Sequence, residues 1–158
     1  MQNWKKPTIK LEKTISVIGE GNILANYIKL YLATLVVFLV IDMLWLGVIA
    51  RGFYQKHLGF LLAPSTNWVA AIVFYLLFIV GILIFVVLPG LRGGTFLDTL
   101  LRAALFGLIT YATYDLTNLA TIRNWPLGLT LVDITWGIVL TSIVSMASYY
   151  IGRWLNIT

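Results

Sequence analysis

Long apolar runs alternate with short polar segments along the chain. The runs cover about residues 27–50, 68–88, 96–122 and 127–151. Each run can form a helix long enough to cross the ~30 Å hydrocarbon core of a bilayer. Pro89 and Gly90 should stop the second run, and the short turn at residues 123–126 should join the last two runs as a helical hairpin. The pattern therefore predicts an all-α membrane protein, a four-helix transmembrane bundle.

Composition supports this prediction. The 158 residues are 60% hydrophobic and only 11% charged, whereas soluble domains carry about 25% charged residues. A soluble globular protein is therefore excluded, and the length allows one bundle with no second folded domain. The chain has no cysteine, which removes disulfides, thiolate metal sites and cysteine nucleophiles from consideration.

Residues 1–26 differ from the rest of the chain, because they are polar and rich in lysine. We therefore divide the chain into this N-terminal segment and a four-span domain at residues 27–158. The segment is predicted to lie at the membrane interface, where anionic lipids attract its lysines. The alternative interpretation is a docking arm for a partner subunit.

Basic residues near the span ends predict the orientation, because cytoplasmic loops carry more lysine and arginine. One side of the membrane would hold Arg51, Lys56 and Arg123. The richer side would hold Lys5, Lys6, Lys10, Lys13, Lys29, Arg92, Arg102 and Arg153. Both termini are therefore expected in the cytoplasm. The net charge of +5 follows from this distribution and indicates no nucleic-acid partner.

Three of the four runs contain one aspartate each, namely Asp42, Asp115 and Asp133. An aspartate at the centre of a span costs about 2.5–3.5 kcal/mol on insertion scales, so it normally faces the bundle interior. Counting at 1.5 Å per residue from the outer ends of the spans places all three roughly 9–14 Å inside the membrane. A shared level in the outer half of the membrane favours one polar centre.

Helical spacing adds companions to the aspartates. Gly107, Tyr111, Asp115 and Asn118 share one stripe, with Tyr114, Thr117 and Thr121 beside it, and Asp133, Gly137, Thr141 and Ser145 recur every fourth residue. Trp45 and Trp136 each follow an aspartate by three positions. The predicted pocket consists of Asp42, Trp45, Tyr75, Tyr111, Tyr114, Asp115, Asn118, Asp133 and Trp136.

Carboxyls gathered in a membrane without lysine or arginine should share protons or hold a cation. Asp115 is expected to be neutral at pH 7 and to hydrogen-bond Tyr111 or Asn118. The competing interpretation is that these polar groups only join helices to one another. No phosphate loop, zinc-helix motif or dinucleotide fingerprint occurs in the sequence, so no metal site, cofactor or catalytic residue is assigned.

The sequence resembles a family of bacterial membrane proteins, domain of unknown function 2177. The likeness extends from about Leu30 to Arg153 and rests on Asp42-Met-Leu-Trp-Leu-Gly47, Tyr54, Leu58-Gly59, Pro64, Tyr111-Ala-Thr-Tyr-Asp-Leu-Thr-Asn-Leu-Ala-Thr121, Trp125-Pro126 and Asp133-Ile-Thr-Trp-Gly137. The resemblance implies a four-span protein of the bacterial cytoplasmic membrane whose marked residues coincide with the polar centre. It implies no activity.

Three functions fit these observations. The first is binding or transport of a small ligand that is cationic or coupled to protons, because carboxyls with aromatic walls attract cations. Transport by four helices would favour a homo-oligomer or a larger membrane complex. The second is an accessory subunit of such a complex. The third is a membrane enzyme that acts on a lipid-soluble substrate with an aspartate as general acid or base.

Overall fold

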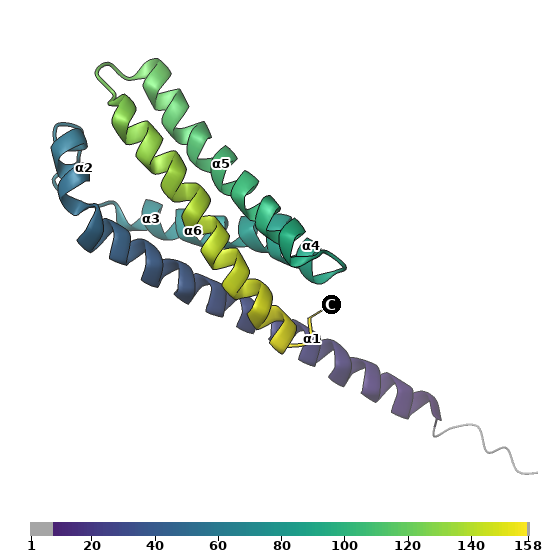
Figure 1. The fold of residues 1–158 in the computed structure, drawn as a ribbon. Helices are drawn as coiled ribbons and strands as arrows, with labels where there is room; N and C mark the ends of the chain where they lie inside the picture. Colours follow the sequence, from purple (N-terminus) through teal and green to yellow (C-terminus); the bar gives the residue numbers. More distant parts are fainter. Residues whose placement is uncertain (1–7, 158) are drawn as a thin grey trace, which may run out of the picture.

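The protein is a bundle of long helices. The computed structural model describes the backbone of residues 8–157 and the side chains of residues 21–157. Its elements are α1 (Thr8–Leu44), η1 (Trp45–Ile49), α2 (Arg51–Leu58), α3 (Trp68–Ile82), η2 (Leu83–Val87), α4 (Leu88–Leu91), α5 (Phe96–Thr121) and α6 (Leu127–Trp154), where η marks a π-helical turn. The helices α5 and α6 lie side by side, and α1 packs against both α6 and α3 (Figure 1).

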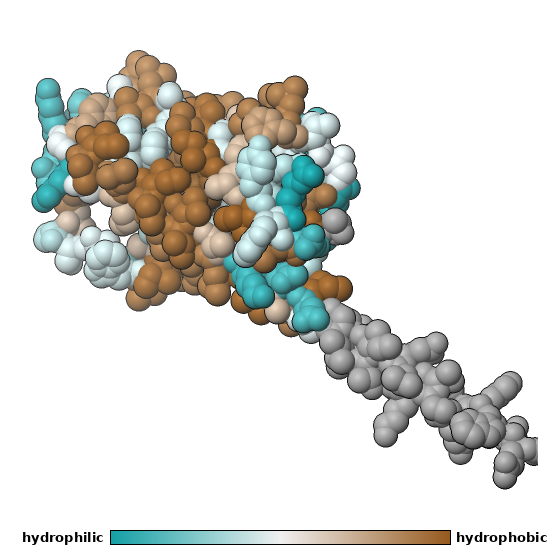
Figure 2. Space-filling model, turned by 60° about the horizontal axis from the view of Figure 1, so that its bottom comes forward, coloured by the Kyte–Doolittle hydropathy of each residue, from teal (hydrophilic) through white to brown (hydrophobic). Residues whose placement is uncertain are grey.

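Four segments of the described chain are long and apolar enough to cross a membrane. They are Gly21–Ile49, Trp68–Leu91, Phe96–Thr121 and Leu127–Trp154. They cover the four predicted runs, so the prediction of an all-α bundle with four membrane spans is confirmed. Figure 2 shows a broad brown band of apolar side chains between two more hydrophilic ends. This surface suits a bilayer, whose acyl chains contact the band while its headgroups meet the ends.

Polar caps explain where two of the spans begin. The Asn67 side chain accepts a hydrogen bond from the backbone N–H of Ala70 (3.1 Å) at the start of α3. At the start of α5 the Thr95 hydroxyl accepts from the N–H of Asp98 (3.1 Å), and the Asp98 carboxylate accepts from the N–H of Thr95 (3.0 Å). This reciprocal pair is a capping box, which satisfies N–H groups that have no partner within the helix.

The second span ends later than the sequence predicted. We expected Pro89 and Gly90 to stop it at about residue 88, but the helix continues to Leu91. The π-helical turn η2 precedes the proline, and the N–H of Leu88 bonds to the carbonyl of Leu83, five residues back. The proline thus lies in the first turn of a new α-helical segment, where its missing N–H does no harm.

Small residues bring α5 and α6 close together. A side-chain carbon at Gly107 would collide with the carbonyl oxygen of Gly137, and one at Gly137 would collide with the ring of Tyr111. Thr141 and Ser145 continue the same face of α6 and are fully buried. The four-residue spacing had predicted such a packed face, because small residues at that interval let another backbone approach.

The core of the bundle lies between α1, the second span and α6. Hydrogen bonds also connect these helices. The Thr34 hydroxyl of α1 donates to the Ser148 hydroxyl of α6 (2.8 Å), and the Tyr31 hydroxyl of α1 donates to the carbonyl of Leu76 in α3 (3.1 Å). The most central apolar side chains are Leu30, Phe38, Ile79, Ile82, Leu140 and Val144. Three spans are therefore held by one shared core.

The N-terminal segment continues the first span as a helix. α1 begins at Thr8 and passes through residue 26 without a break, and Figure 1 shows it extending beyond the rest of the bundle. Residues 1–7 of this segment lie outside the described part of the chain. Contact of residues 1–26 with the membrane interface stays a prediction, as does the alternative of a docking arm.

The first span begins beside the end of the last one. The Asn26 amide donates to the carbonyl of Leu155 (3.0 Å), and Figure 1 shows the C-terminus at the end of the bundle where α1 leaves it. The turn between α4 and α5 lies at this end, whereas α2 and the turn between α5 and α6 lie at the other. Whether the terminal end faces the cytoplasm stays a prediction.

Cysteine labelling tests this orientation, since the chain has no cysteine of its own. We expect a membrane-impermeant maleimide added to intact cells to label a Ser65→Cys variant and to leave an Arg92→Cys variant unlabelled until the cells are opened. Ser65 and Arg92 lie in connections at opposite ends of the bundle. The reverse labelling pattern would show that the bundle has the opposite orientation.

Candidate functional site

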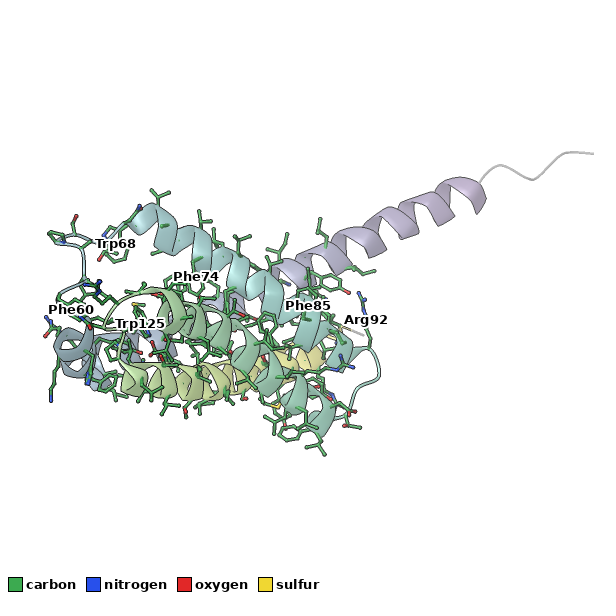
Figure 3. All side chains as sticks on the ribbon, turned by 90° about the horizontal axis from the view of Figure 1, so that it is seen from above. Phe60, Trp68, Phe74, Phe85, Arg92 and Trp125 are labelled. Atoms are coloured by element: carbon green, nitrogen blue, oxygen red, sulfur yellow. The ribbon has the colours of Figure 1, made fainter. Side chains whose placement is uncertain are left out.

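Three helices each bury one aspartate in the half of the bundle that α2 covers. The exposed fractions are 5% for Asp42 on α1, 0% for Asp115 on α5 and 9% for Asp133 on α6. Figure 3 labels Phe60 and Trp125 at this end of the molecule. A carboxyl buried in a membrane is unfavourable unless it has hydrogen-bond partners or is neutralised.

Asp42 is held by donors from two other helices. The Tyr75 hydroxyl of α3 donates to its Oδ2 atom (3.0 Å), and the Trp136 indole of α6 donates to its Oδ1 atom (3.4 Å). Hydrogen bonds to an ionised carboxylate are among the stronger ones in proteins. Asp42 therefore joins α1, α3 and α6 at one point, and both of its oxygens have a partner.

Asp133 is held by a residue that follows the first span. The chain leaves α1 through the π-helical turn η1 and then forms α2, which carries Tyr54. The Tyr54 hydroxyl donates to the Oδ1 atom of Asp133 and accepts a hydrogen bond from the indole N–H of Trp45 (3.2 Å). π-Helical turns often occur at functional sites, and here one begins with Trp45, which packs against Trp136 of α6.

Two stacked indoles connect these hydrogen-bonded groups. The rings of Trp45 and Trp136 lie 4.2 Å apart between centroids with planes within 8° of parallel. Each tryptophan follows its aspartate by three residues, and the fold brings the two pairs together. Asp115 and Asp133 lie on the neighbouring helices α5 and α6, in the same half of the bundle. The result is one cluster, which we call the aspartate cluster: Asp42, Trp45, Tyr54, Tyr75, Asp115, Asp133 and Trp136.

Tyr54 is a cluster residue that the sequence prediction missed. Burial raises its pKa well above the usual value, with further contributions from the hydrogen bond to Asp133 and from the charges of Asp133 and Asp42. Tyr54 therefore keeps its proton at physiological pH and stays a hydrogen-bond donor. Its only signal in the sequence was its place among the residues that carry the family resemblance, because Tyr54 lies outside the predicted spans and so has no helical spacing to an aspartate.

Removing this hydroxyl should weaken the protein. We expect Tyr54→Phe to lower the free energy of unfolding by about 1–3 kcal/mol, because Asp133 would remain buried without its donor. Thermal melts in detergent measure this change. The control is Tyr150→Phe, since Tyr150 is 58% exposed and its hydroxyl forms no hydrogen bond with a described residue. Equal melting temperatures for the two variants would contradict the role given to Tyr54.

Asp115 differs from the other two aspartates because neither of its carboxylate oxygens has a hydrogen-bond partner among the described residues. The bonds expected from Tyr111 and Asn118 are not formed, and the three carboxyls do not bond to one another. Side chains on a helix lean toward its N-terminus, so the long Tyr111 side chain extends away from Asp115. Its ring packs against Gly137 instead, and edge-on to Phe78 (6.3 Å between centroids, 81°).

The other predicted pocket residues of α5 lie apart from the cluster. Tyr114 is 59% exposed, and its ring meets Trp125 edge-on at 5.9 Å. Asn118 is half-buried and its side chain forms no hydrogen bond with a described residue. Thr117 and Thr121 donate to carbonyls of their own helix (2.5 and 2.7 Å). Only some of the polar residues along α5 therefore face the bundle interior.

The three aspartates are not arranged to bind a metal ion together. Within the described part of the chain, no three side chains of the types that bind metals come close enough to hold one ion. The arrangement offers one carboxylate without a donor beside two carboxylates that already have donors. Such a site can receive a proton or a single cationic group.

Apolar grooves on the surface reach the aromatic residues of this region. One groove of about 550 Å³ between α3 and α5 is lined by Phe74, Phe78 and Tyr111. Another of about 660 Å³ between the first two spans is lined by Trp68 and by Tyr75, which bonds Asp42. Both volumes fall in the range of small-molecule sites, about 300–1,000 Å³. Because both grooves lie between spans, a ligand dissolved in the bilayer can reach them.

Comparison with known proteins agrees with the fold and with the resemblance seen in the sequence. A family model described as "Predicted membrane protein (DUF2177)" matches residues 27–150. This range includes the whole aspartate cluster. No curated protein and no solved structure matches the chain.

Proposed function

The chain belongs to the DUF2177 family of predicted membrane proteins, and we propose that it binds a small ligand, cationic or coupled to a proton, at the aspartate cluster. That it is a multi-pass membrane protein follows from the family and from the four spans. The proposal concerns what the buried aspartates do within those spans.

One observation carries the proposal: Asp115 is fully buried, and its carboxylate has no donor among the described residues. A buried polar group without a partner destabilises a protein by about 1–3 kcal/mol, and more when it is charged. Structural aspartates avoid this by taking donors, as Asp42 does with Tyr75 and Trp136. The charge of Asp115 can therefore be neutralised by a proton or balanced by a bound cationic group.

An aromatic groove near Asp115 suits an organic cation. Tyr111 lies one helical turn before Asp115 and, although its side chain extends away from that carboxyl, it lines the groove between α3 and α5 together with Phe74 and Phe78. Aromatic faces attract ammonium groups by cation–π interaction, more strongly where water is excluded. The ligand would enter from the bilayer along this groove, and its charged group would have to pass the aromatic lining to reach Asp115, which is fully buried and does not itself line the groove. A small lipid-soluble amine, which carries both a proton and apolar substituents, fits this route.

Tryptophan fluorescence provides the test, because the stacked Trp45 and Trp136 belong to the same cluster. Methylammonium and tetramethylammonium would be titrated into the protein purified in mild detergent. We expect a saturable change in emission with the wild type and its loss in Asp115→Asn, which keeps the shape of the side chain and removes its charge. Asp98→Asn is the matched control, since Asp98 lies at the other end of the bundle in a helix cap.

The outcomes separate the possibilities. An equal response of wild type and Asp115→Asn would refute a role for Asp115 in cation binding. A response to methylammonium alone would indicate that the site needs an N–H donor, whereas a response to both amines would indicate that charge and aromatic contact suffice. Transport, assembly into an oligomer, the accessory subunit and the membrane enzyme stay predictions from the sequence.

A further inference from the structure

A second polar feature lies at the end of the bundle opposite the aspartate cluster. Here α6 ends beside the turn between α4 and α5, and the two enclose a hollow of about 410 Å³. Its lining includes Gly90, Gly94, Tyr149, Arg153 and Asn156. We call it the C-terminal hollow. It shares no residue with the aspartate cluster or with the apolar grooves described above.

The end of α6 shapes one wall of this hollow. The N–H of Asn156 bonds to the carbonyl of Arg153 (3.1 Å), and the N–H of Ile157 bonds to the carbonyl of Gly152 (3.0 Å). With Asn156 at φ 55°, these bonds make the left-handed turn that commonly ends a helix. The turn reverses the chain and buries Ile157, which is 6% exposed. Arg153 and Asn156 are thereby fixed on the same wall.

Backbone forms the opposite wall. The N–H of Gly94 bonds to the carbonyl of Gly90 (3.0 Å) where α4 turns toward α5. Gly90 packs so closely on Thr99 that a side-chain carbon there would collide with the threonine hydroxyl. A side-chain carbon at Gly94 would likewise collide with the backbone of Gly90, so this close-packed turn requires glycine at both positions.

The polar side chains that line the hollow can donate hydrogen bonds, and one of them, Arg153, carries a positive charge. The Arg153 guanidinium lies 5.8 Å from the centre of the Tyr149 ring, which holds it by cation–π attraction. No carboxylate of a described residue forms a salt bridge with Arg153, and the hydroxyl of the buried Tyr149 forms no hydrogen bond with a described residue. Together with the Asn156 amide, these groups suit an anion with several oxygens.

We propose that the C-terminal hollow binds a phosphate group, and its depth favours the headgroup of an anionic lipid as the source. Arg153 is in the last turn of the span Leu127–Trp154, which places it at the level of the headgroups. Trp154 beside it is 80% exposed, as expected of an aromatic residue at the membrane interface. Arg92 and Arg102 are also exposed at this end and add to the attraction for anionic lipid.

Native mass spectrometry of the full chain in mild detergent tests the proposal with phosphatidylglycerol and phosphatidylcholine as probes. We expect the wild type to bind phosphatidylglycerol more tightly than phosphatidylcholine. Arg153→Gln should weaken phosphatidylglycerol binding about tenfold or more, because it removes a charged bidentate donor. Asn156→Asp, which can keep the helix-ending turn, should weaken it through charge repulsion.

Arg51→Gln is the matched control, because Arg51 is exposed at the other end of the bundle, and it should bind phosphatidylglycerol like the wild type. Inorganic phosphate separates the two sources of the ligand. Displacement of the lipid by phosphate would support a site for the phosphate group itself, and resistance to phosphate would support the lipid headgroup. The proposal is overturned if Arg153→Gln and Asn156→Asp both bind phosphatidylglycerol like Arg51→Gln, or if phosphatidylcholine binds equally well to the wild type.

Discussion

Asparagine in place of Asp115 should leave the protein at least as stable as the wild type, whereas asparagine in place of Asp42 should destabilise it. Asp115 has no donor among the described residues, so its replacement breaks no hydrogen bond, and where the carboxylate is ionised it also removes a charge that is unfavourable in a membrane. Asp42 accepts from both Tyr75 and Trp136. The same chemical change is thus expected to have opposite effects at two buried aspartates of one cluster.

The loss at Asp42 should be about 1–3 kcal/mol in free energy of unfolding. An asparagine has one carbonyl oxygen, so one of the two donors would face an NH₂ group and lose its acceptor. Thermal melts of both variants and the wild type, in the same detergent and without added ligand, measure the difference. The comparison controls for the asparagine itself, because both sites are nearly fully buried.

The titration with amines shows whether the stability of Asp115→Asn is related to ligand binding. If Asp115→Asn keeps its stability and loses its response to amines, the carboxylate is a site maintained for a ligand. Functional groups often remain at a position where they destabilise the free protein. A strong destabilisation of Asp115→Asn would show instead that the carboxylate is engaged in holding the bundle together, and the proposed binding site would be rejected.

Alanine in place of Gly107 should destabilise the bundle by about 1–3 kcal/mol or more, although alanine is the better helix former. The added carbon would collide with the carbonyl oxygen of Gly137. A flexible side chain could move aside, but this neighbour is backbone, so α5 and α6 would have to separate. Because Asp115 and Asp133 lie on these two helices, their separation should also alter the aspartate cluster.

Gly128→Ala is the matched control for this substitution. Gly128 is on α6, and a side-chain carbon there would meet no atom within 4 Å. We expect this variant to be as stable as the wild type or more stable by up to about 1 kcal/mol, since alanine restricts the unfolded chain. Thermal melts would contradict the close contact of α5 and α6 if Gly107→Ala and Gly128→Ala behaved alike.

The membrane spans could be predicted because their signal is local. A run of about twenty apolar residues is sufficient to form a helix across a bilayer whatever surrounds it, and the structure has spans at all four predicted runs. The extension of the second span through Pro89 could not be predicted in this way. It depends on the π-helical turn η2 just before the proline, and the apolar sequence of that turn gives no sign of its hydrogen-bond register.

The site could be predicted in part. A charged residue in an apolar span must avoid lipid, so the burial of Asp42, Asp115 and Asp133 follows from the sequence and agrees with the structure. Spacing along a helix shows which residues share a face, but it does not show which way a long side chain extends. For this reason Tyr111 was expected to bond Asp115, whereas its ring packs against Gly137.

The sequence by itself determined that this is a four-span membrane protein with three aspartates turned away from lipid, because both properties follow from the cost of placing polar groups in hydrocarbon. Only the tertiary structure decided which aspartates have donors. Tyr75 and Trp136 reach Asp42, and Tyr54 reaches Asp133, from other parts of the chain. Asp115 has no such donor among the described residues, because hydrogen bonds between helices depend on how the helices pack, and that packing brings no donor to its carboxylate.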